Sequence, residues 1–200
     1  MTPARLFLDV GSPYAYLAAE RADALLPGAV WEPVLLGGVF RANGRSSWAR
    51  TPAREEGMRE IERRAAAYGL PPVVWPEPWP GDMLTAMRAA TAAKALGAER
   101  AFLLAALRLG FREGRDMSDR DAVLDAARLA GLDADAINTA VDDPFVKALL
   151  RAATDEAHAL GVFGVPTALV GDQLFWGDDR LEDAAAAAGS APAGGAGAGA

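Results

Sequence analysis

Residues 5–16, RLFLDVGSPYAY, carry the two signals that decide the fold. The first six of them form a short, mostly apolar run, as a buried strand does. Ser12 and Pro13 come next, and a serine followed by a proline is typical of a helix N-terminus, with the serine as N-cap. We therefore expect a strand over 5–10 that leads directly into a helix over 13–26.

Further strands are expected at both ends of the chain. The apolar run 30–36, interrupted by Pro33, predicts a second strand. The helix between the first two strands makes them parallel. Near the C-terminus, 167–170 and 173–176 flank a Gly-Asp turn and predict a β-hairpin, which a short closing helix follows.

The middle of the chain has a helical pattern. Apolar residues recur at helical spacing over much of 51–160. Within this block we expect Ser118 to cap one helix and Pro144 to be the first residue of another. The proline-rich segment 69–82 cannot be regular helix and is expected to connect two helices.

This order, β-α-β, then helices, then β-β-α, predicts an α/β fold of thioredoxin-like type with a large inserted all-helical domain. We expect a discontinuous thioredoxin-like domain over 1–45 and 155–188 and a helical insertion over 46–154. The Gly/Ala-rich segment 189–200 has too little apolar surface to fold and is expected to be a disordered tail.

Composition narrows the possible functions. The chain has 200 residues, 52% of them hydrophobic, and a formal net charge of -7, which argues against nucleic-acid or anionic-membrane partners. It has no cysteine, which excludes disulfide exchange, and its single histidine, His158, excludes a Ser-His-Asp triad and a histidine-cluster metal site. No secretion signal and no run long enough for a membrane span is visible, so we expect a cytoplasmic protein.

Ser12 has two interpretations. In the first it is an ordinary N-cap, and the local stretch by itself favours this. In the second it also serves a ligand, because a helix N-terminus stabilises an anion and a hydroxyl there can donate to a bound thiolate. No base lies near it in sequence, which argues against an acylated serine nucleophile.

Two other stretches combine a structural and a functional interpretation. Val165-Pro166 precedes an apolar strand, where a proline is either a plain strand start or part of a cis peptide bond. Asp179 and Glu182 fit a capping box, while Asp178 and Asp179 would also place carboxylates where a ligand ammonium could bind.

Other prominent residues favour structural roles. The charged run 54–64 is expected to be a solvated helix face with i,i+4 ion pairs, and His158 a surface residue. Aromatic residues near proline-rich loops more often pack than bind substrate, and this applies to Trp48, Trp75, Trp79 and Trp176.

Four blocks together carry a family resemblance: FLDVGSPYAYLA, LLGGVFRANG, GDMLTAMRAA and GVFGVPTALVGDQLFWGDDRL. In this order they resemble 2-hydroxychromene-2-carboxylate isomerases and the related kappa-class glutathione transferases, over nearly the whole chain. The resemblance implies a thioredoxin-like fold similar to that of bacterial disulfide oxidases, with a serine in place of their reactive cysteine. The thiol would come from bound glutathione or another low-molecular-weight thiol.

The resemblance also implies roles for residues. Ser12 would hold the glutathione sulfur, and Val165, before a cis-Pro166, would pair its backbone with the cysteinyl part. Asp178 and Asp179 would bind the γ-glutamyl end. The remaining expected contacts are Arg41, which replaces a family lysine and would meet a carboxylate, and Asn43 and Ser47 in the following loop.

The implied reaction is a cis-trans isomerisation in aromatic catabolism, by reversible thiolate addition to a conjugated carbon and without a metal. The resemblance also implies a homodimer, which is common among relatives. Two departures from the family pattern leave the identity of the substrate undecided. They are Asp82, where relatives often have asparagine, and the altered loop 45–56. The alternatives are a thiol transferase of similar fold and a non-catalytic thioredoxin-like module that binds a small molecule.

Overall fold

The computed structural model describes residues 3–190 and forms one mixed sheet in the order β2-β1-β3-β4. β1 (Arg5–Leu8) pairs in parallel with β2 (Val30–Pro33) and antiparallel with β3 (Thr167–Val170). β3 forms the predicted hairpin with β4 (Gln173–Trp176). The first and last parts of the chain therefore meet along β1.

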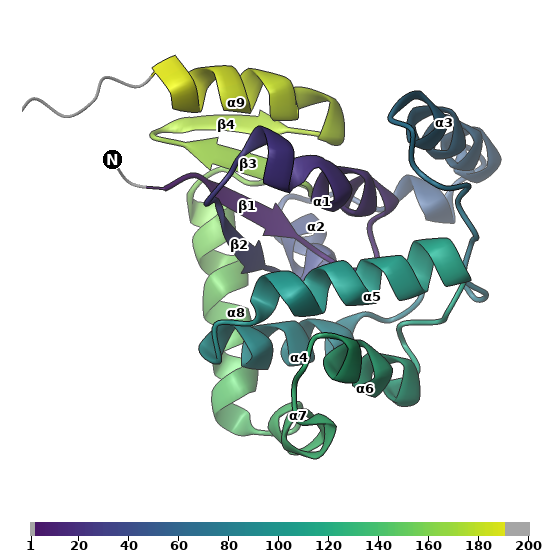
Figure 1. Cartoon of the computed structure of the whole chain (residues 1–200), viewed down its shortest axis with the longest axis vertical. Helices are drawn as coiled ribbons and strands as arrows, with labels where there is room; N and C mark the ends of the chain where they lie inside the picture. Colours follow the sequence, from purple (N-terminus) through teal and green to yellow (C-terminus); the bar gives the residue numbers. More distant parts are fainter. Residues whose placement is uncertain (1–2, 191–200) are drawn as a thin grey trace, which may run out of the picture.

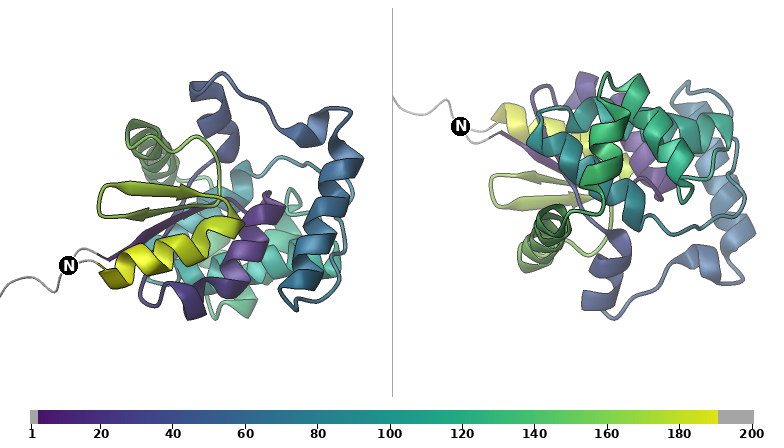
Figure 2. Two further views of the ribbon diagram at one scale, coloured as in Figure 1. Left: turned by 90° about the horizontal axis from the view of Figure 1, so that it is seen from above. Right: turned by 90° about the horizontal axis from the view of Figure 1, so that it is seen from below.

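Helices cover both faces of this sheet (Figures 1 and 2). Successive residues of a strand point to opposite faces, so Leu6 and Leu8 enter the larger hydrophobic core while Phe7 enters a second one. The larger core contains residues of α1 (Pro13–Leu25) and α9 (Leu181–Ser190), and the second contains residues of α2 (Leu36–Ala42) and α8 (Pro144–Ala159).

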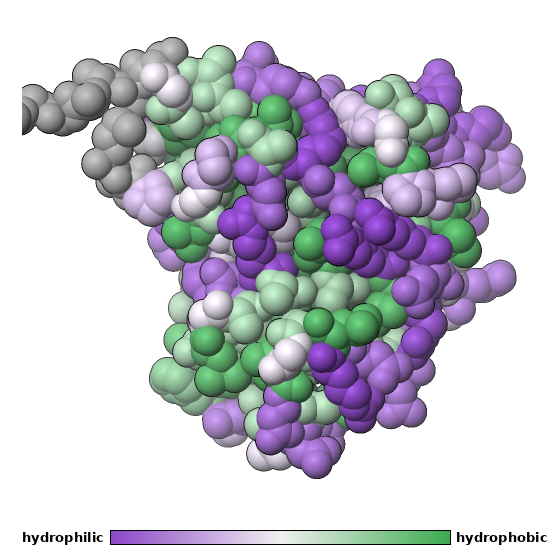
Figure 3. Space-filling view, viewed as in Figure 1, coloured by the Kyte–Doolittle hydropathy of each residue, from purple (hydrophilic) through white to green (hydrophobic). Residues whose placement is uncertain are grey.

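The central part of the chain is helical, as predicted. α5 (Glu99–Glu113) packs along α1, and its Phe102 and Leu103 lie in the same core as Leu6 and Leu8. The outer face of this block, seen in Figure 3, is a mixture of hydrophilic and hydrophobic residues. The helices of the block are α3 (Arg54–Ala67), α4 (Leu84–Ala95), α5 (Glu99–Glu113), α6 (Arg120–Leu129) and α7 (Ala134–Ala140).

Helix starts follow local sequence signals. Pro144 is the first residue of α8, as predicted, and Asp143 caps that helix. The predicted cap at Ser118 is wrong by one residue, because Asp119 caps α6. The Ser118 hydroxyl is instead bonded to the Asp116 carboxylate at 2.7 Å.

α2 is the main element that the sequence did not predict. The strand expected over 30–36 ends at Pro33, and α2 begins at Leu36. Two glycines make this segment a poor helix former by itself. It is held by packing: a Cβ on Gly38 would lie 3.0 Å from the Thr154 side chain of α8.

Two expectations near the end of the chain need correction. The capping box at Asp179 and Glu182 is absent: Asp178–Arg180 forms a 3-10 turn before α9, and Glu182 pairs with Arg21. α9 extends to Ser190, so the first two residues of the expected tail are helical. The rest of that tail lies outside the described residues.

α8 runs without a break through the domain boundary expected at 154/155, and the division into domains stays a prediction.

Candidate functional site

A cavity of about 1260 Å³ lies beside the N-terminus of α1, where the parallel strands β1 and β2 end. Its walls come from α2 and the loop after it, the connection before α4, and the turns that flank the C-terminal hairpin. All but one of the residues predicted for the site line it: Ser12, Arg41, Ser47, Val165, Pro166, Asp178 and Asp179.

The N-cap predicted at Ser12 is confirmed, and the residue also lines the cavity. Its side chain accepts a hydrogen bond from the Ala15 N–H at 3.2 Å, which caps α1. Its hydroxyl also donates to the main-chain carbonyl of Val165 at 3.3 Å. The residue is only 4% exposed, yet it lines the cavity. An anion at this point would meet a hydroxyl and the positive end of a helix dipole.

The segment before β3 forms the part of the cavity wall beside Ser12. The peptide bond between Val165 and Pro166 is cis. Val165 is 5% exposed and belongs to the second core, and the Pro166 carbonyl accepts from the Gly177 N–H at 2.9 Å. The main chain of Val165 is thus fixed on both sides and presents its carbonyl to Ser12.

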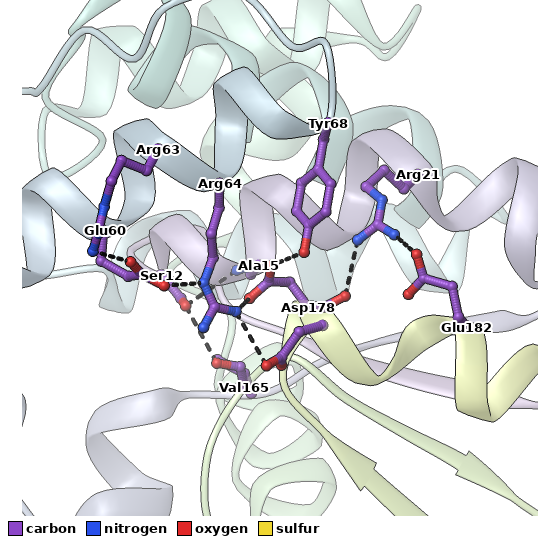
Figure 4. A network of polar contacts seen from close by, with 11 residues as sticks. Ser12, Ala15, Arg21, Glu60, Arg63, Arg64, Tyr68, Val165, Asp178 and Glu182 are labelled. Carbon is purple, nitrogen blue, oxygen red and sulfur yellow. Dashed lines mark hydrogen bonds and ion pairs between the residues drawn. The ribbon is translucent and has the colours of Figure 1, made fainter.

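Asp178 is the centre of a polar network that joins α3 to the start of α9 (Figure 4). Its side chain is fully buried and accepts from Arg64 at 3.0 Å and from the Tyr68 hydroxyl at 2.9 Å. Burial raises the pKa of Asp178, and the Arg64 guanidinium opposes this rise. Burial, together with Asp178, raises the pKa of Tyr68 to about 12. The Tyr68 hydroxyl therefore stays protonated and donates its hydrogen bond to the Asp178 carboxylate. Arg21 stacks on the Tyr68 ring at 3.7 Å and donates to the Asp178 carbonyl.

The neighbouring carboxylate, that of Asp179, is more exposed than that of Asp178. Asp179 has a side chain that is 53% exposed, and one of its oxygens lies 3.4 Å from Arg64. Both oxygens of Asp178 already have protein partners, whereas Asp179 lines the cavity with room for another one. Of the two acids predicted to bind a ligand, Asp179 is therefore the accessible one.

Asp9 is a buried carboxylate in the cavity wall that was not predicted as a site residue. It is 2% exposed, and its two oxygens accept from the Gly11 and Leu36 N–H groups, each at 2.7 Å. Burial raises the pKa of Asp9 to about 6, with a further contribution from the charge of Asp82. The only sequence signal for it is a carboxylate at the end of an apolar run.

Three arginines lie on the side of the cavity formed by α2 and the loop after it. None of the ion pairs within residues 3–190 involves Arg41, Arg45 or Arg50. Arg45 lies over the rings of Phe163 and Trp176, at 5.0 and 5.4 Å. In a chain of net charge -7, this unmatched positive charge favours an anionic ligand.

Asn43 does not belong to the cavity wall. Its side-chain amide donates to the Val39 carbonyl at 2.9 Å at the end of α2 and lies 3.3 Å from the exposed His158 ring. Ser47 does line the cavity, and its hydroxyl caps the 3-10 turn Trp48–Arg50 through the Ala49 N–H.

Aromatic rings cover part of the cavity. Trp48 and Trp79 have ring centroids 5.4 Å apart, and the Trp79 indole N–H donates to the Gly11 carbonyl at 3.2 Å. Tyr14 lies edge-on to Trp48 at 6.2 Å. Both tryptophans, with Trp176, line the cavity, so they combine packing with access to a ligand.

Arg64 is the other residue that sequence reasoning missed. The expected i,i+4 pair exists, since Arg64 contacts Glu60 at 2.7 Å. The guanidinium also reaches Asp178 and lines the cavity, so this part of α3 is more than a solvated face. The available signal was the four-residue spacing of Arg64 and Tyr68, which places both on one side of the helix.

Comparisons with known proteins identify the family and the fold of the chain. A family model described as DSBA-like thioredoxin domain matches residues 5–188. A 2-hydroxychromene-2-carboxylate isomerase from Sphingobium xenophagum is 31% identical over 186 residues, which cover 88% of this chain and 92% of that protein. None of the helices within residues 3–190 is both long and apolar enough to cross a membrane.

Solved structures show the same fold. A 2-hydroxychromene-2-carboxylate isomerase matches with a TM-score of 0.84 at 23% identity, covering 94% of this chain and 95% of that one. The cytosolic disulfide reductase DsbM from Pseudomonas aeruginosa, solved with glutathione, matches with a TM-score of 0.59 at 20% identity over 86% of this chain and 87% of that one. The chain therefore belongs to the DsbA-like thioredoxin family, in the group that includes 2-hydroxychromene-2-carboxylate isomerase.

Proposed function

We propose that the protein is a thiol-dependent cis-trans isomerase of the 2-hydroxychromene-2-carboxylate isomerase type, with glutathione as the thiol. The observation that carries this proposal is the Ser12 hydroxyl, which faces a large cavity at the N-terminus of α1 in a chain without cysteine. The thioredoxin-like site thus lacks its own sulfur and offers the groups that would stabilise a bound one.

The cavity suits two ligands at once. Pockets for a single small ligand have volumes of roughly 300–1,000 Å³, and this one has about 1260 Å³. Asp179 would receive the ammonium of the γ-glutamyl end, with Asp178 holding the turn in place. Arg41 would receive a carboxylate, as a planar fork with two parallel donors. Trp48 and Trp79 leave an aromatic wall for the second ligand.

For this reaction the protein has to bind the substrate and the thiol and to stabilise the thiolate. The sulfur adds to the conjugated carbon of the ring-opened substrate, and the electron pair of the double bond moves to the carbonyl oxygen as an enolate. The carbon-carbon bond is then single and can rotate. Collapse of the enolate expels the same thiolate and restores the double bond in the other geometry. Ser12 and the N–H groups of α1 would lower the pKa of the thiol and so supply its reactive form.

Conversion of 2-hydroxychromene-2-carboxylate with and without reduced glutathione tests the proposal. We expect turnover that requires the thiol, is lost in Ser12→Ala, and returns all of the glutathione unconjugated. Turnover of equal rate without any thiol would contradict it.

A transferase of the kappa-like type is the second candidate, and the size of the cavity also supports it. Product analysis separates the two, because a transferase consumes glutathione and leaves a stable conjugate. A non-catalytic binding module would bind the thiol or the aromatic compound and turn over neither.

A further inference from the structure

We propose that Asp9 is a positioning residue for the Ser12 site, and that its ionised carboxylate holds the Ser12 turn against the start of α2. The inference rests on the proposed thiol site at Ser12. It concerns a buried group of the cavity wall to which the mechanism above gives no part.

One carboxylate joins two walls of the cavity. Its Oδ1 accepts from the Gly11 N–H, and the Asp9 carbonyl accepts from the Ser12 N–H at 3.1 Å. Together they fold the turn that presents the Ser12 hydroxyl. Its Oδ2 accepts from the N–H of Leu36, the first residue of α2. α2 carries Arg41 on the same cavity, so the position of Ser12 relative to this arginine depends on Asp9.

The two N–H donors explain why a carboxylate stands here. An ionised aspartate offers acceptors on both oxygens, while an asparagine offers one acceptor and an NH₂ group that would face a donor. Protonation weakens one of the two bonds, since the oxygen that then carries the hydrogen is a poorer acceptor and its O–H needs an acceptor of its own. Two strong bonds therefore require the ionised form of Asp9.

The surroundings make this ionisation sensitive to pH. The side chain is buried, which disfavours the charge, and Asp82 adds a like charge from the connection before α4. The first turn of α1 has no acidic residue, and the 165–167 segment has no charged one. In α2 the one charged residue is Arg41, in the last turn. With the pKa of Asp9 raised to about 6, the carboxylate loses its charge just below neutral pH.

NMR of the wild-type protein tests the geometry without any ligand. We expect the amide signals of Gly11 and Leu36, and the indole signal of Trp79, to shift together with one midpoint near pH 6. In Asp82→Asn this midpoint should move to lower pH, because a like charge is gone. In Asp9→Asn these shifts should vanish. Asp133→Asn is the matched control, since Asp133 also accepts two main-chain N–H bonds but caps α7 on an exposed surface.

Activity provides the second readout. Wild type and Asp133→Asn should lose kcat as the pH falls through the same midpoint, and Asp82→Asn should follow its own NMR midpoint. Asp9→Asn should lose kcat by about tenfold to a hundredfold at every pH and lack the acid limb at the Asp9 midpoint, so that only the titration of the bound thiol remains. A merely structural role would lower the melting temperature but leave the limb at the Asp9 midpoint in place.

The outcomes separate this inference from the proposed function. Coincident NMR midpoints in a protein that turns over no substrate would refute the proposed function and leave Asp9 as the group that holds the turn. An acid limb at the Asp9 midpoint that persists in Asp9→Asn, or activity that rises as Asp9 takes up its proton, would overturn the inference. Should Asp9→Asn fail to fold, an unmoved limb in Asp82→Asn would overturn it as well.

Discussion

The Ser12 hydroxyl and the Val165 carbonyl are hydrogen-bonded at 3.3 Å, although 153 residues separate them in the chain. The contact joins the turn after the first strand to the turn before the hairpin. The same hydroxyl oxygen caps α1 through the Ala15 N–H. A thiol that binds beside Ser12 would compete with Val165 for the hydroxyl hydrogen, which couples ligand binding to the junction of the two halves.

Ser12→Ala is expected to have a structural and a chemical effect that can be separated. Loss of the N-cap should lower the free energy of unfolding by about 1 kcal/mol. Asp143→Ala is the matched control, because Asp143 also caps a helix that begins with a proline. Urea unfolding should give similar losses for both variants, while only Ser12→Ala loses glutathione-dependent turnover. Equal turnover in the two variants would contradict a role for the hydroxyl.

Asp178 and Asp179 are expected to behave differently although they are neighbours. Asp178→Ala removes a buried acceptor from Arg64 and Tyr68 and should cost about 2 kcal/mol in the free energy of unfolding. Asp179→Ala should change stability by less than about 0.5 kcal/mol. Calorimetry should show that Asp179→Ala still weakens glutathione binding. Unchanged affinity in a stable Asp179→Ala protein would remove Asp179 from the proposed site.

Arg41→Met should weaken the binding of glutathione by about tenfold, since a hydrogen-bonded ion pair is lost. Glutathione with an esterified glycyl carboxylate should bind wild type and Arg41→Met with equal affinity if that carboxylate is the partner. Arg151→Met, on α8, removes an exposed arginine away from the cavity and serves as the control. A loss of affinity that is the same for glutathione and its ester would assign Arg41 to another group.

Gly57→Ala should displace Trp48 from the cavity wall. A Cβ at this position of α3 would lie 2.2 Å from the Trp48 ring, so the ring must move. Such overpacking costs about 1–3 kcal/mol. Gly189→Ala in α9 is the control, because apart from its chain neighbours and the backbone of its own helix no atom of the described residues lies within 4 Å of its added Cβ. Tryptophan fluorescence and unfolding should change only in Gly57→Ala; an unchanged spectrum would show that Trp48 does not fill this space.

Asp9 should make the protein less stable as the pH rises. Its folded pKa of about 6 lies above the ordinary value of 3.8, so the folded state binds the proton more tightly than the unfolded chain. The free energy of unfolding should therefore fall as the pH rises between these two values, by about 3 kcal/mol at most. Asp9→Asn should lack this contribution. Urea unfolding of both proteins from pH 4.5 to 7.5 should show that the difference between their free energies of unfolding becomes smaller as the pH rises. A constant difference would mean that Asp9 does not titrate in this range.

The sequence predicted the elements whose signals are local. The apolar runs gave β1, β3 and β4, and Pro144 marked the start of α8. α2 was missed because Gly37 and Gly38 oppose a helix, and it depends on tertiary contacts, namely packing against α8 and the bond from the Leu36 N–H to Asp9. The position of the hydrophobic cores depends on pairing between distant strands, which no local pattern contains.

The site was predictable only in part for the same reason. Ser12 and the 165–166 pair are marked by motifs, and the structure brings them together. Arg64 and Asp9 gain their positions from contacts with residues far along the chain, such as Asp178 and Leu36. Asn43 was expected in the site from its place in the loop, but α2 ends there and turns its amide back to Val39.

The central claim is that a bound thiol is held as a thiolate at Ser12, and its ultraviolet absorbance tests this most directly. The chain has no cysteine, so any thiolate signal belongs to the ligand. With saturating glutathione, we predict that the thiolate absorbance of the wild-type complex appears at distinctly lower pH than that of free glutathione, and that this shift is lost in Ser12→Ala. A bound thiol that titrates as in free solution, or an unchanged shift in Ser12→Ala, would contradict the account.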